Sequence, residues 1–464
     1  MSSLLLHNTL TREKSPVTNK NITLYTCGPT VYNYAHIGNL RTYMFEDLLK
    51  RALLFLGYRV KHVMNITDVD DKTIRGAIAS GQSLDAFCST YQTAFAEDLA
   101  SLRILPADAY PKATEHIPGM IRMIETLLKK GHAYKSPDGS IYFSIASYRD
   151  YGKLSGLSLE GLQHGASNRL EDEYDKDHAS DFVLWKAHNP DRDGAIFWES
   201  PFGRGRPGWH IECSCMCLEH LGDTIDIHCG GVDNIFPHHE NEIAQSECYT
   251  GKPFVHLWCH AAHLIVDGKK MSKSKNNFYT LRDLLEKGHA PATIRYLLLH
   301  VHYRAQLNFT FEGLSAANAS LRRIRDCIYR LEKVEDAGSL DPSLGDRFLE
   351  KFREALADDL NISLALSALF DLIREANLLM DQTKLSQKSA SHLLAIIKMM
   401  DSVFGFCFFS EEKTPKTIID ALEKREEARR NKHWEEADRL RDVIHAAGYL
   451  IEDTPSGARV KKQS

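Results

Sequence analysis

Alternating runs of hydrophobic and polar residues define one unit between residues 21 and 67. The runs NITLYTC (21–27) and RVKHVMNIT (59–67) are short and apolar, as expected of buried strands. Between them, apolar residues recur at helical spacing up to Gly57, namely at Leu40, Met44, Leu48, Ala52 and Phe55. This order predicts two parallel strands joined by a crossover helix. Asn39 stands at the predicted N-cap, so the turn 36–39 would lie at the positive end of that helix.

The rest of the chain shows several further patterns. Residues 84–135 are mostly helical in spacing, and residues 140–208 are irregular, with strand-like aromatic pieces SIYFSI, DFVLWKA and AIFWES. A second strand–helix unit runs through DTIDIHCGG, HHENEIAQSEC and FVHLWCHAAHLIV. Residues 315–410 predict a helical bundle, and residues 416–448 predict one charged helix before a strand–turn–strand segment. Together they predict an α/β fold: a Rossmann-like parallel sheet split by an insertion, then an all-α helical bundle and a small C-terminal α/β module.

Composition narrows the class of protein. With 464 residues, 43% hydrophobic and 26% charged, the chain is expected to be a multidomain globular protein. The net charge is only −5, so a nucleic-acid partner would have to bind a local basic surface. The apolar stretch in MSSLLLHNTLTREK is too short for a signal peptide, and no later run reaches the length of a membrane span. We therefore expect a cytoplasmic protein without a membrane partner.

Cysteine and histidine spacing points to a metal site. His238 and Glu242 in HHENE are four residues apart, so both leave the same face of a helix. A surface ion pair would explain that spacing equally well. Ten cysteines, several of them in ECSCMCLEH (212–220), favour a zinc site made of thiolates, an imidazole and a carboxylate. Spacing alone leaves the thiolates open among Cys213, Cys217, Cys229 and Cys27.

Two charged segments allow both a functional and a structural interpretation. KKMSKSKNN (269–277) places four lysines in a short polar loop, which is either a solvated loop or a cationic segment that binds triphosphate. NITDVDDK carries Asp68, Asp70 and Asp71, which are either magnesium ligands or part of a turn at the end of a strand. The sequence does not decide between them.

The motifs HIGN (36–39) and KMSKS (270–274) together resemble the paired signatures of class I aminoacyl-tRNA synthetases. TCGPTVY, GRPGWHIECS and GGVDNIFPHHENEIAQS are similar to the cysteinyl-tRNA synthetase family in particular, and the likeness extends over essentially the whole chain. The resemblance implies ATP-dependent ligation of L-cysteine to the 3′ end of tRNA(Cys) through a cysteinyl-adenylate. It also implies one Zn²⁺ per chain that selects the substrate thiolate, and Mg²⁺ accompanying ATP.

The resemblance also implies the site residues. The zinc ligands would be Cys27, Cys213, His238 and Glu242. The amino-acid pocket would contain Gly28, Thr67, Trp209 and Asp233. ATP would be bound by His36, Gly38, Asn39, Lys270, Met271, Ser272, Lys273 and Ser274, with His36, Asn39, Lys270 and Lys273 as the catalytic residues. Asn39 departs from the fullest family pattern, which has a second histidine there, and an asparagine carries no positive charge.

The resemblance further divides the chain into functional parts. It implies that the helical bundle and the terminal module bind the anticodon stem and loop, with Trp434 as a stacking face and Asp438 as a base-edge acceptor. An amphipathic helix packed in the module is the alternative for these two residues. We expect a monomer. The predicted domains are 1–135 and 209–260 (catalytic halves), 136–208 (insertion), 261–314 (KMSKS loop and stem-contact region), 315–412 (bundle) and 413–464 (terminal module).

Two other functions share some of these motifs. A ligase that passes cysteine from the same adenylate to a small amine would have the same zinc and ATP sites. A zinc- and RNA-binding module without catalysis would share the metal site alone. The extended C-terminal region favours tRNA as the acceptor.

Overall fold

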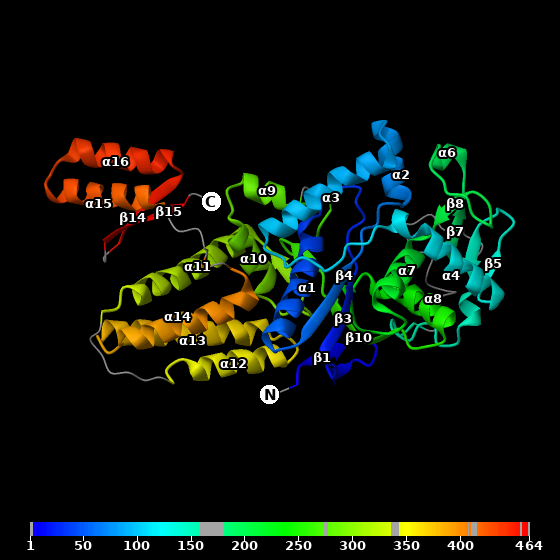
Figure 1. Ribbon diagram of the computed structural model, residues 1–464, viewed down its shortest axis with the longest axis horizontal. Coiled ribbons are helices and arrows are strands. Elements are labelled where there is room, and N and C mark those ends of the chain that lie inside the picture. Colours follow the sequence, from blue (N-terminus) through cyan, green and yellow to red (C-terminus); the bar gives the residue numbers. More distant parts are fainter. Residues whose placement is uncertain are drawn as a thin grey trace. The chain divides into compact units, whose positions relative to one another are not determined.

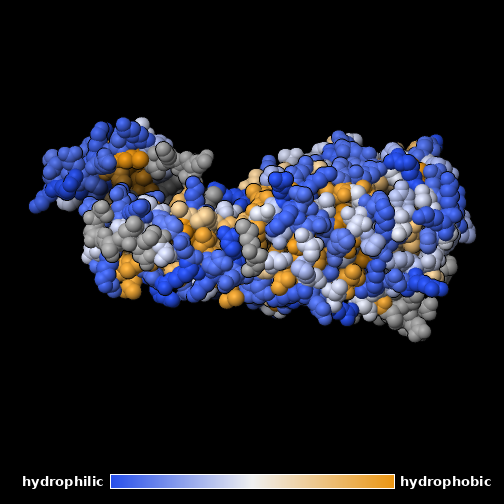
Figure 2. Space-filling model, turned by 60° about the horizontal axis from the view of Figure 1, so that its bottom comes forward, coloured by the Kyte–Doolittle hydropathy of each residue, from blue (hydrophilic) through white to orange (hydrophobic). Residues whose placement is uncertain are grey.

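The structure is a computed structural model that describes residues 3–157, 181–272, 277–335, 343–406, 408–409, 415–454 and 457–462. It divides into two compact units, Met1–Phe406 and Cys407–Ser464 (Figure 1). None of the helices within the described ranges is long and apolar enough to cross a membrane. The face drawn in Figure 2 is mostly hydrophilic, with hydrophobic side chains in scattered groups.

A four-stranded parallel sheet lies at the centre of the first unit. Its strand order is β10 (Val255–Ala261), β9 (Ile225–Gly231), β3 (Asn21–Thr26) and β4 (Arg59–Met64). Two strands therefore precede the predicted insertion (136–208) and two follow it, and Figure 1 shows the blue and green strands side by side. The predicted parallel sheet split by an insertion is confirmed.

The crossover helix α1 (Ile37–Phe55) joins β3 to β4. Four of the five predicted apolar positions along it are buried, namely Leu40, Met44, Leu48 and Ala52, and Phe55 at its end is half-buried. The predicted N-cap is wrong by three residues: His36 caps the helix, and Asn39 is the third residue of its first turn. The sequence signal misled because asparagine is a common N-cap residue, whereas here the histidine ring accepts the capping hydrogen bond.

Residues between β4 and β9 form helices and a second sheet. This four-stranded sheet is antiparallel, in the order β5 (Ala133–Lys135), β6 (Ile141–Phe143), β7 (Phe182–Ala187) and β8 (Gly205–Pro207). Its apolar face packs with α4, and the shared core includes Phe143, Trp185 and Met120. AIFWES makes no strand, only an isolated bridge at Trp198. The helices here are α2 (Asp71–Ser80), α3 (Leu84–Ser101), α4 (Ile117–Lys129) and the short α6 (Pro190–Asp193).

Two helices follow the insertion and pack against each other: α7 (Trp209–Leu221) before β9 and α8 (Glu240–Thr250) between β9 and β10. A five-residue π-helical turn (Ile235–His239) precedes α8. The hairpin β1 (Leu5–Asn8) and β2 (Glu13–Pro16) lies beside β10. A small sheet of β12 (Lys269–Lys270), β11 (Leu264–Val266) and β13 (Leu307–Phe309) comes next, with α9 (Leu281–Glu286) and α10 (Pro291–Leu299).

The predicted helical bundle is confirmed at the end of the first unit. It contains α11 (Phe311–Glu332), α12 (Asp346–Ala357), α13 (Ile362–Asp381) and α14 (Gln387–Phe404). The buried guanidinium of Arg295 on α10 ties it to α1 by pairing with Asp47 and donating 2.6 Å to the carbonyl of Phe404. Arg295 therefore connects the bundle to the helix that follows the turn 36–39.

The second unit is a helical hairpin with a two-stranded antiparallel sheet. The single charged helix predicted for residues 416–448 is wrong, because the segment forms α15 (Lys416–Arg430) and α16 (Trp434–Ala446). Lys432 has φ 61° at the break, a left-handed conformation that ends the first helix. The predicted strand–turn–strand segment is confirmed as β14 (Tyr449–Thr454) and β15 (Gly457–Lys462).

Candidate functional site

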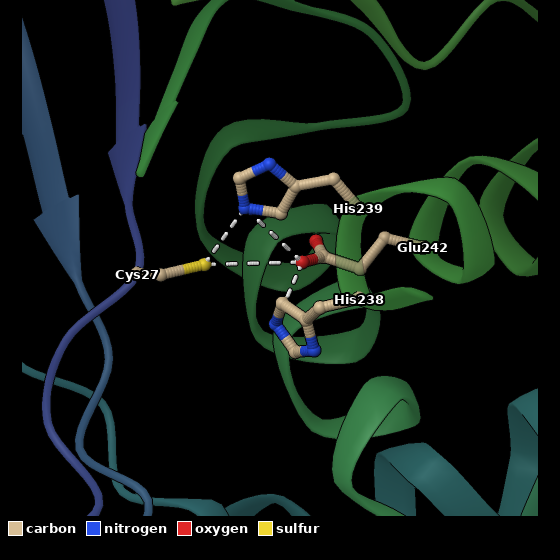
Figure 3. Close-up of side chains that lie close together, drawn as sticks. All are labelled: Cys27, His238, His239 and Glu242. Carbon is tan, nitrogen blue, oxygen red and sulfur yellow. Dashed lines mark hydrogen bonds and ion pairs between the residues drawn. The ribbon is translucent and has the colours of Figure 1, made fainter. Parts of the chain in front are cut away.

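A cluster of metal-ligating side chains lies at the carboxyl ends of the central strands. Cys27 directly follows β3, whereas His238, His239 and Glu242 follow β9 on the π-helical turn and the first turn of α8. Figure 3 shows the four side chains pointing toward one another. This edge of an open parallel sheet is where ligands bind. The β-α-β topology thus brings together residues more than 200 positions apart in the sequence.

The ligand atoms of this cluster converge on one point. The carboxylate oxygen Oε1 of Glu242 lies 3.0 Å from Nε2 of His238 and 3.9 Å from Sγ of Cys27. The Cys27 sulfur lies 3.2 Å from Nε2 of His239. All four ligand atoms are within 4.8 Å of one another. The donor atoms around a tetrahedral zinc lie roughly 3.3 to 3.8 Å apart, so the observed spacing suits such an ion.

Cys213 reaches the same place from α7. Cys213 is 1% exposed, and its thiol is close enough to the Cys27 thiol and to the His238 ring for both to shift its pKa. The group of four converging side chains therefore contains three of the ligands implied by the resemblance, Cys27, His238 and Glu242, and the fourth, Cys213, lies in the adjoining apolar cluster. Cys215 packs in the insertion core, as its position on the opposite face of α7 requires. Cys217 lies in the apolar cluster between α7, α8 and the sheet.

His239 is a member of the cluster that the sequence analysis missed. It stands three residues before Glu242, a spacing that also places two side chains on one helical face, so HHENE contained the signal. Its Nδ1 lies 2.7 Å from Nε2 of His260, whose Nδ1 lies 2.7 Å from the hydroxyl of Thr9. His239 is either a ligand itself or the outer partner that orients Cys27.

Electrostatics make the cluster a cation site. The Cys27 hydrogen bond lowers the pKa of Cys213 to about 6, although burial opposes this shift. Burial alone would raise the pKa of Glu242, but the imidazoles of His228 and His238 lower it to about 2. Burial alone would lower the pKa of His238, yet Glu242 and Cys213 raise it to about 10. The buried Cys213 thiolate and Glu242 carboxylate are both negatively charged, and together they keep the His238 imidazole protonated. They form an anionic site that suits a divalent cation.

Further histidines hold the ligands in place. His228 Nε2 lies 3.0 Å from the second oxygen of Glu242, and His210 Nδ1 lies 3.0 Å from Nδ1 of His238. Metal ligands commonly use such outer hydrogen bonds to fix their orientation. The donor set of sulfur, nitrogen and oxygen fits zinc, and its members are buried except for the half-buried Cys27.

Of the residues expected in the amino-acid pocket, Trp209 contacts the cluster and Gly28 directly follows Cys27. Trp209, the first residue of α7, stacks on His238 with ring centroids 4.2 Å apart. Gly28 has no room for a side chain, because a Cβ atom would lie 1.8 Å from the carbonyl oxygen of Asn65. Thr67 is buried and its backbone N–H donates to the carbonyl of Pro29. Asp233 is exposed, two residues beyond the end of β9.

The turn 36–39 is built by a reciprocal capping box. The Asn39 N–H donates 3.1 Å to Nδ1 of the His36 ring, and the His36 N–H donates 3.2 Å to Oδ1 of Asn39. A Cβ atom at Gly38 would lie 2.9 Å from the His36 ring and 3.3 Å from Cε of Met271. The glycine thus permits the close approach of the two signature segments.

Residues around the KMSKS motif contact the same turn. The N–H of Ile37 donates to the carbonyl of Tyr279, and the His36 ring packs edge-on against Phe278. Lys270 is exposed on β12. The side-chain amide of Asn277 donates to the Lys270 carbonyl and accepts a hydrogen bond from the Ser272 N–H. Lys273 and Ser274 lie outside the described residues.

The aspartates of NITDVDDK have protein partners in the described structure. Asp68 accepts hydrogen bonds from the N–H and hydroxyl of Thr114, and Asp70 caps α2. Asp71 pairs with Arg206 and with Lys186. These contacts favour the structural interpretation of the motif over a magnesium site.

The two residues expected to contact tRNA lie on α16 in the second unit. Trp434 is 60% exposed at the start of the helix. Asp438 pairs with Arg441 at 3.1 Å on the same helix. An exposed indole is compatible with stacking on a base. Their contact with tRNA stays a prediction.

Comparison with known families covers most of the chain. Residues 13–319 match the class I tRNA synthetase (C) catalytic domain, residues 351–409 the DALR domain, and residues 412–460 the cysteinyl-tRNA ligase anticodon binding domain. The chain is 56% identical over 469 residues to the cysteine–tRNA ligase of Protochlamydia amoebophila (strain UWE25), covering 99% of this chain and 98% of that protein. It is 55% identical over 474 residues to the cysteine–tRNA ligase of Chlamydia muridarum (strain MoPn / Nigg), covering 99% of each.

Solved structures of class I synthetases share the fold. Mycobacterium tuberculosis methionyl-tRNA synthetase bound by methionyl-adenylate superposes with a TM-score of 0.60 at 14% identity, covering 87% of this chain and 94% of that one. Agrobacterium radiobacter K84 leucyl-tRNA synthetase, in a ternary complex, gives 0.60 at 12% identity and covers 85% of both chains. From its family matches and its relatives, the chain belongs to the class I aminoacyl-tRNA synthetases and, within them, to the cysteine–tRNA ligase family.

Proposed function

We propose that this chain ligates L-cysteine to the 3′ end of tRNA(Cys) through a cysteinyl-adenylate, using ATP. One observation carries the proposal: Cys27, which belongs to the cluster of thiol, imidazole and carboxylate groups, and the capped turn 36–39 both follow β3 at the same edge of the sheet. The proposed metal site, which would bind the substrate sulfur, and the proposed phosphate site are thus separated by one short loop. The relatives named cysteine–tRNA ligase support the same reaction.

The metal in this proposal is zinc, held by Cys27, Cys213, His238 and Glu242. When bound, zinc supplies a Lewis acid that takes the substrate sulfur as a thiolate. A free thiol has a pKa of about 8.5 and ionises readily on a metal, whereas the hydroxyl of serine stays protonated. Discrimination of cysteine from serine by a factor of 10⁴ to 10⁵ needs a difference in binding free energy of about 5.5 to 7 kcal/mol. A difference of one small group in a pocket provides less than this. The chain contributes two thiols, an imidazole and a carboxylate already oriented by His228, His210 and His239.

The chemical steps need no protein nucleophile. A carboxylate oxygen of cysteine attacks the α-phosphorus of ATP, and the bond to pyrophosphate breaks. A hydroxyl of the terminal ribose then attacks the cysteinyl carbonyl, and AMP leaves with the electron pair of the broken bond. The first step gathers negative charge on the phosphates, which the amino end of α1, His36, Lys270, Lys273 and the Mg²⁺ of ATP would stabilise. Asn39 holds His36 at the helix end.

The C-terminal third would read the tRNA. It carries none of the residues assigned to adenylate formation, and its last 49 matched positions resemble an anticodon binding domain, residues 412–460. We infer that the bundle binds the anticodon stem and that the second unit binds the loop, with Trp434 and Asp438 contacting bases. We further expect the enzyme to act as a cytoplasmic monomer and keep the domain limits given above as predictions.

Cysteine-dependent exchange of pyrophosphate into ATP tests the first step. We expect exchange with cysteine, no exchange with serine at equal concentration, and one zinc per chain by metal analysis. Charging of tRNA(Cys) then separates this function from a ligase that uses a small amine. Exchange without charging would contradict the tRNA assignment, and absence of exchange would contradict the whole proposal.

A further inference from the structure

The last turn of α7 and the start of α4 form a second cluster of metal-ligating side chains, outside the site described above. Glu219 and His220 lie near the end of α7, and His116 ends the 3₁₀ turn Ala113–His116 that leads into α4. Helix α7 packs against both of these elements, and Figure 1 shows α4 and α7 close together. The three side chains have no role in the proposed reaction.

The two imidazoles of this cluster face each other through nitrogens that can bind a metal. Nε2 of His116 lies 3.0 Å from Nε2 of His220, and the ring centroids are 5.2 Å apart. Nδ1 of His116 lies 2.7 Å from the carbonyl oxygen of Lys112, and because a carbonyl only accepts, this nitrogen carries a hydrogen. Nε2 of a neutral His116 ring therefore presents a lone pair toward His220. Backbone carbonyls commonly orient metal-binding histidines in this way.

His220 is also suited to metal coordination. Burial lowers the pKa of His220 and the neighbouring His116 lowers it further, although Glu219 opposes the shift, so the ring is neutral near pH 7. The neutral imidazole is the form that binds a metal ion. Two neutral rings at this distance either share one hydrogen bond or bind one ion together.

Glu219 adds a carboxylate to the two imidazoles. Its Oε2 lies 3.8 Å from Nε2 of His116, and its Oε1 accepts a hydrogen bond of 2.9 Å from Arg122 on α4. Gly119 on α4 leaves space for this carboxylate, because a Cβ atom there would lie 2.2 Å from Oε1. Arg122 thus fixes one oxygen and leaves the other beside His116. Donor atoms that share a zinc-sized ion lie roughly 3 to 4 Å apart, as these do.

We propose that His116, His220 and Glu219 bind a second divalent transition-metal ion of the zinc class. Two imidazole nitrogens and a carboxylate oxygen favour such an ion over Mg²⁺ or Ca²⁺, which prefer oxygen ligands. The side chain of His116 is 13% exposed and that of Glu219 is 39% exposed, so the ion enters from solvent and keeps water as a further ligand. It joins the end of α7, the helix that carries Cys213, to the start of α4.

Zinc titration of the full chain that already holds its first zinc tests this site. The wild type should take up one further Zn²⁺ with a Kd of about 1 to 10 μM, measured by competition with a chromophoric chelator, and Mg²⁺ should not displace it. His220→Ala should weaken this uptake by about 100-fold, and Glu219→Gln, which keeps an acceptor for Arg122, by about 10-fold. His256→Ala removes an exposed histidine from β10 and is the matched control that keeps the second ion.

Two further measurements separate loss of the ion from loss of the fold. Wild-type cysteine-dependent exchange in His220→Ala would show that the chain is folded and that its first metal site is intact. The second ion should raise the melting temperature of the wild type and not that of His220→Ala, because it binds only the folded chain.

Two results would overturn the proposal. The first is no second ion in the wild type at about 100 μM Zn²⁺, ten times the upper expected Kd, since the two rings would then only share a hydrogen bond. The second is uptake of the ion with wild-type affinity by both His220→Ala and Glu219→Gln, since the ion would then bind elsewhere. If His220→Ala does not fold, Glu219→Gln alone decides, because it preserves the contact with Arg122.

Discussion

The metal cluster and the turn 36–39 sit at one edge of the same sheet but are organised in different ways. In the cluster, His238, His239 and Glu242 are almost completely buried, and each has further imidazole neighbours. In the turn, Asn39 is exposed, and the geometry is set by a glycine and by hydrogen bonds in which backbone N–H groups donate to the side chains of His36 and Asn39. The cluster depends on the chemistry of its side chains, whereas the turn depends on the path of its backbone.

This difference matches two tasks. Selection of a thiol requires donors whose positions and charges are fixed before the substrate arrives, because any rearrangement would reduce the discrimination. Phosphoryl chemistry requires N–H groups and cations around a ligand that enters from solvent. Substitutions in the cluster should therefore change which amino acid is used, and substitutions in the turn should change how fast it is used.

The largest effect is expected from Cys213→Ala. Removal of one thiolate ligand should reduce bound zinc far below one per chain. Cysteine-dependent exchange should fall by about 10³-fold, equivalent to about 4 kcal/mol. Metal analysis and exchange kinetics measure the two quantities.

Two further variants sharpen this result. Cys215→Ala on the same helix faces the insertion core, so it should keep its zinc and lose only about 1 to 2 kcal/mol of stability. His239→Ala should weaken zinc binding by about 10- to 100-fold if the histidine is an outer partner. Full zinc in Cys213→Ala together with loss of zinc in His239→Ala would show that His239, and not Cys213, is the fourth ligand.

The next effect is expected from Lys270→Ala. Loss of a cation at the phosphates should lower kcat for exchange by about 10²-fold and change the KM for cysteine less than twofold. Lys269→Ala, the adjacent exposed residue on β12, is the matched control. An equal loss in kcat and in cysteine affinity would show that the loop supports the fold and not the chemistry.

The sequence predicted elements well where the hydrophobic pattern was long. The crossover helix, the split parallel sheet and the bundle follow from periodic burial, which persists in the folded chain at Leu40, Met44 and Leu48. The sequence analysis did not predict where a short polar segment ends one helix and begins the next. The residues Asn431, Lys432 and His433 are all compatible with a helix, yet Lys432 takes a left-handed conformation and separates α15 from α16. Tertiary packing around Ile418, Leu440 and Ile444 decides that break.

In the candidate site, sequence spacing identified pairs of residues on one helical face, but it did not identify the residues that approach them from other parts of the chain. His238 and Glu242 are four residues apart, so the sequence showed their common face; Cys27 joins them only through the strand order. Glu212 gave no signal, because a glutamate next to a cysteine on a helix looks like an ordinary surface residue. Only the structure shows that this glutamate, on α7, is fully buried.

A smaller effect is expected from Gly38→Ala. The added Cβ would press on the His36 ring at 2.9 Å and on the Met271 methyl at 3.3 Å, so the two signature segments would move apart. Exchange should fall by about 10-fold, because misplacement by a fraction of an ångström reduces the rate without removing a charge. Zinc content should stay at the wild-type value. Loss of zinc here would mean that the turn and the cluster form one unit, which would abolish the distinction between them.

The smallest effect is expected at Asn39. Asn39→Ala removes one arm of the capping box and should cost about 1 kcal/mol of stability, with only a few-fold loss in exchange. Asn39→Gln keeps an amide that reaches back to the His36 N–H, so it should recover most of the stability in urea denaturation. If Asn39→Ala is as stable as the wild type but loses more than about 100-fold in exchange, the amide acts on ATP directly. The turn would then depend on side-chain chemistry as the cluster does, and the missing second cation of the motif would be replaced by a hydrogen-bond donor.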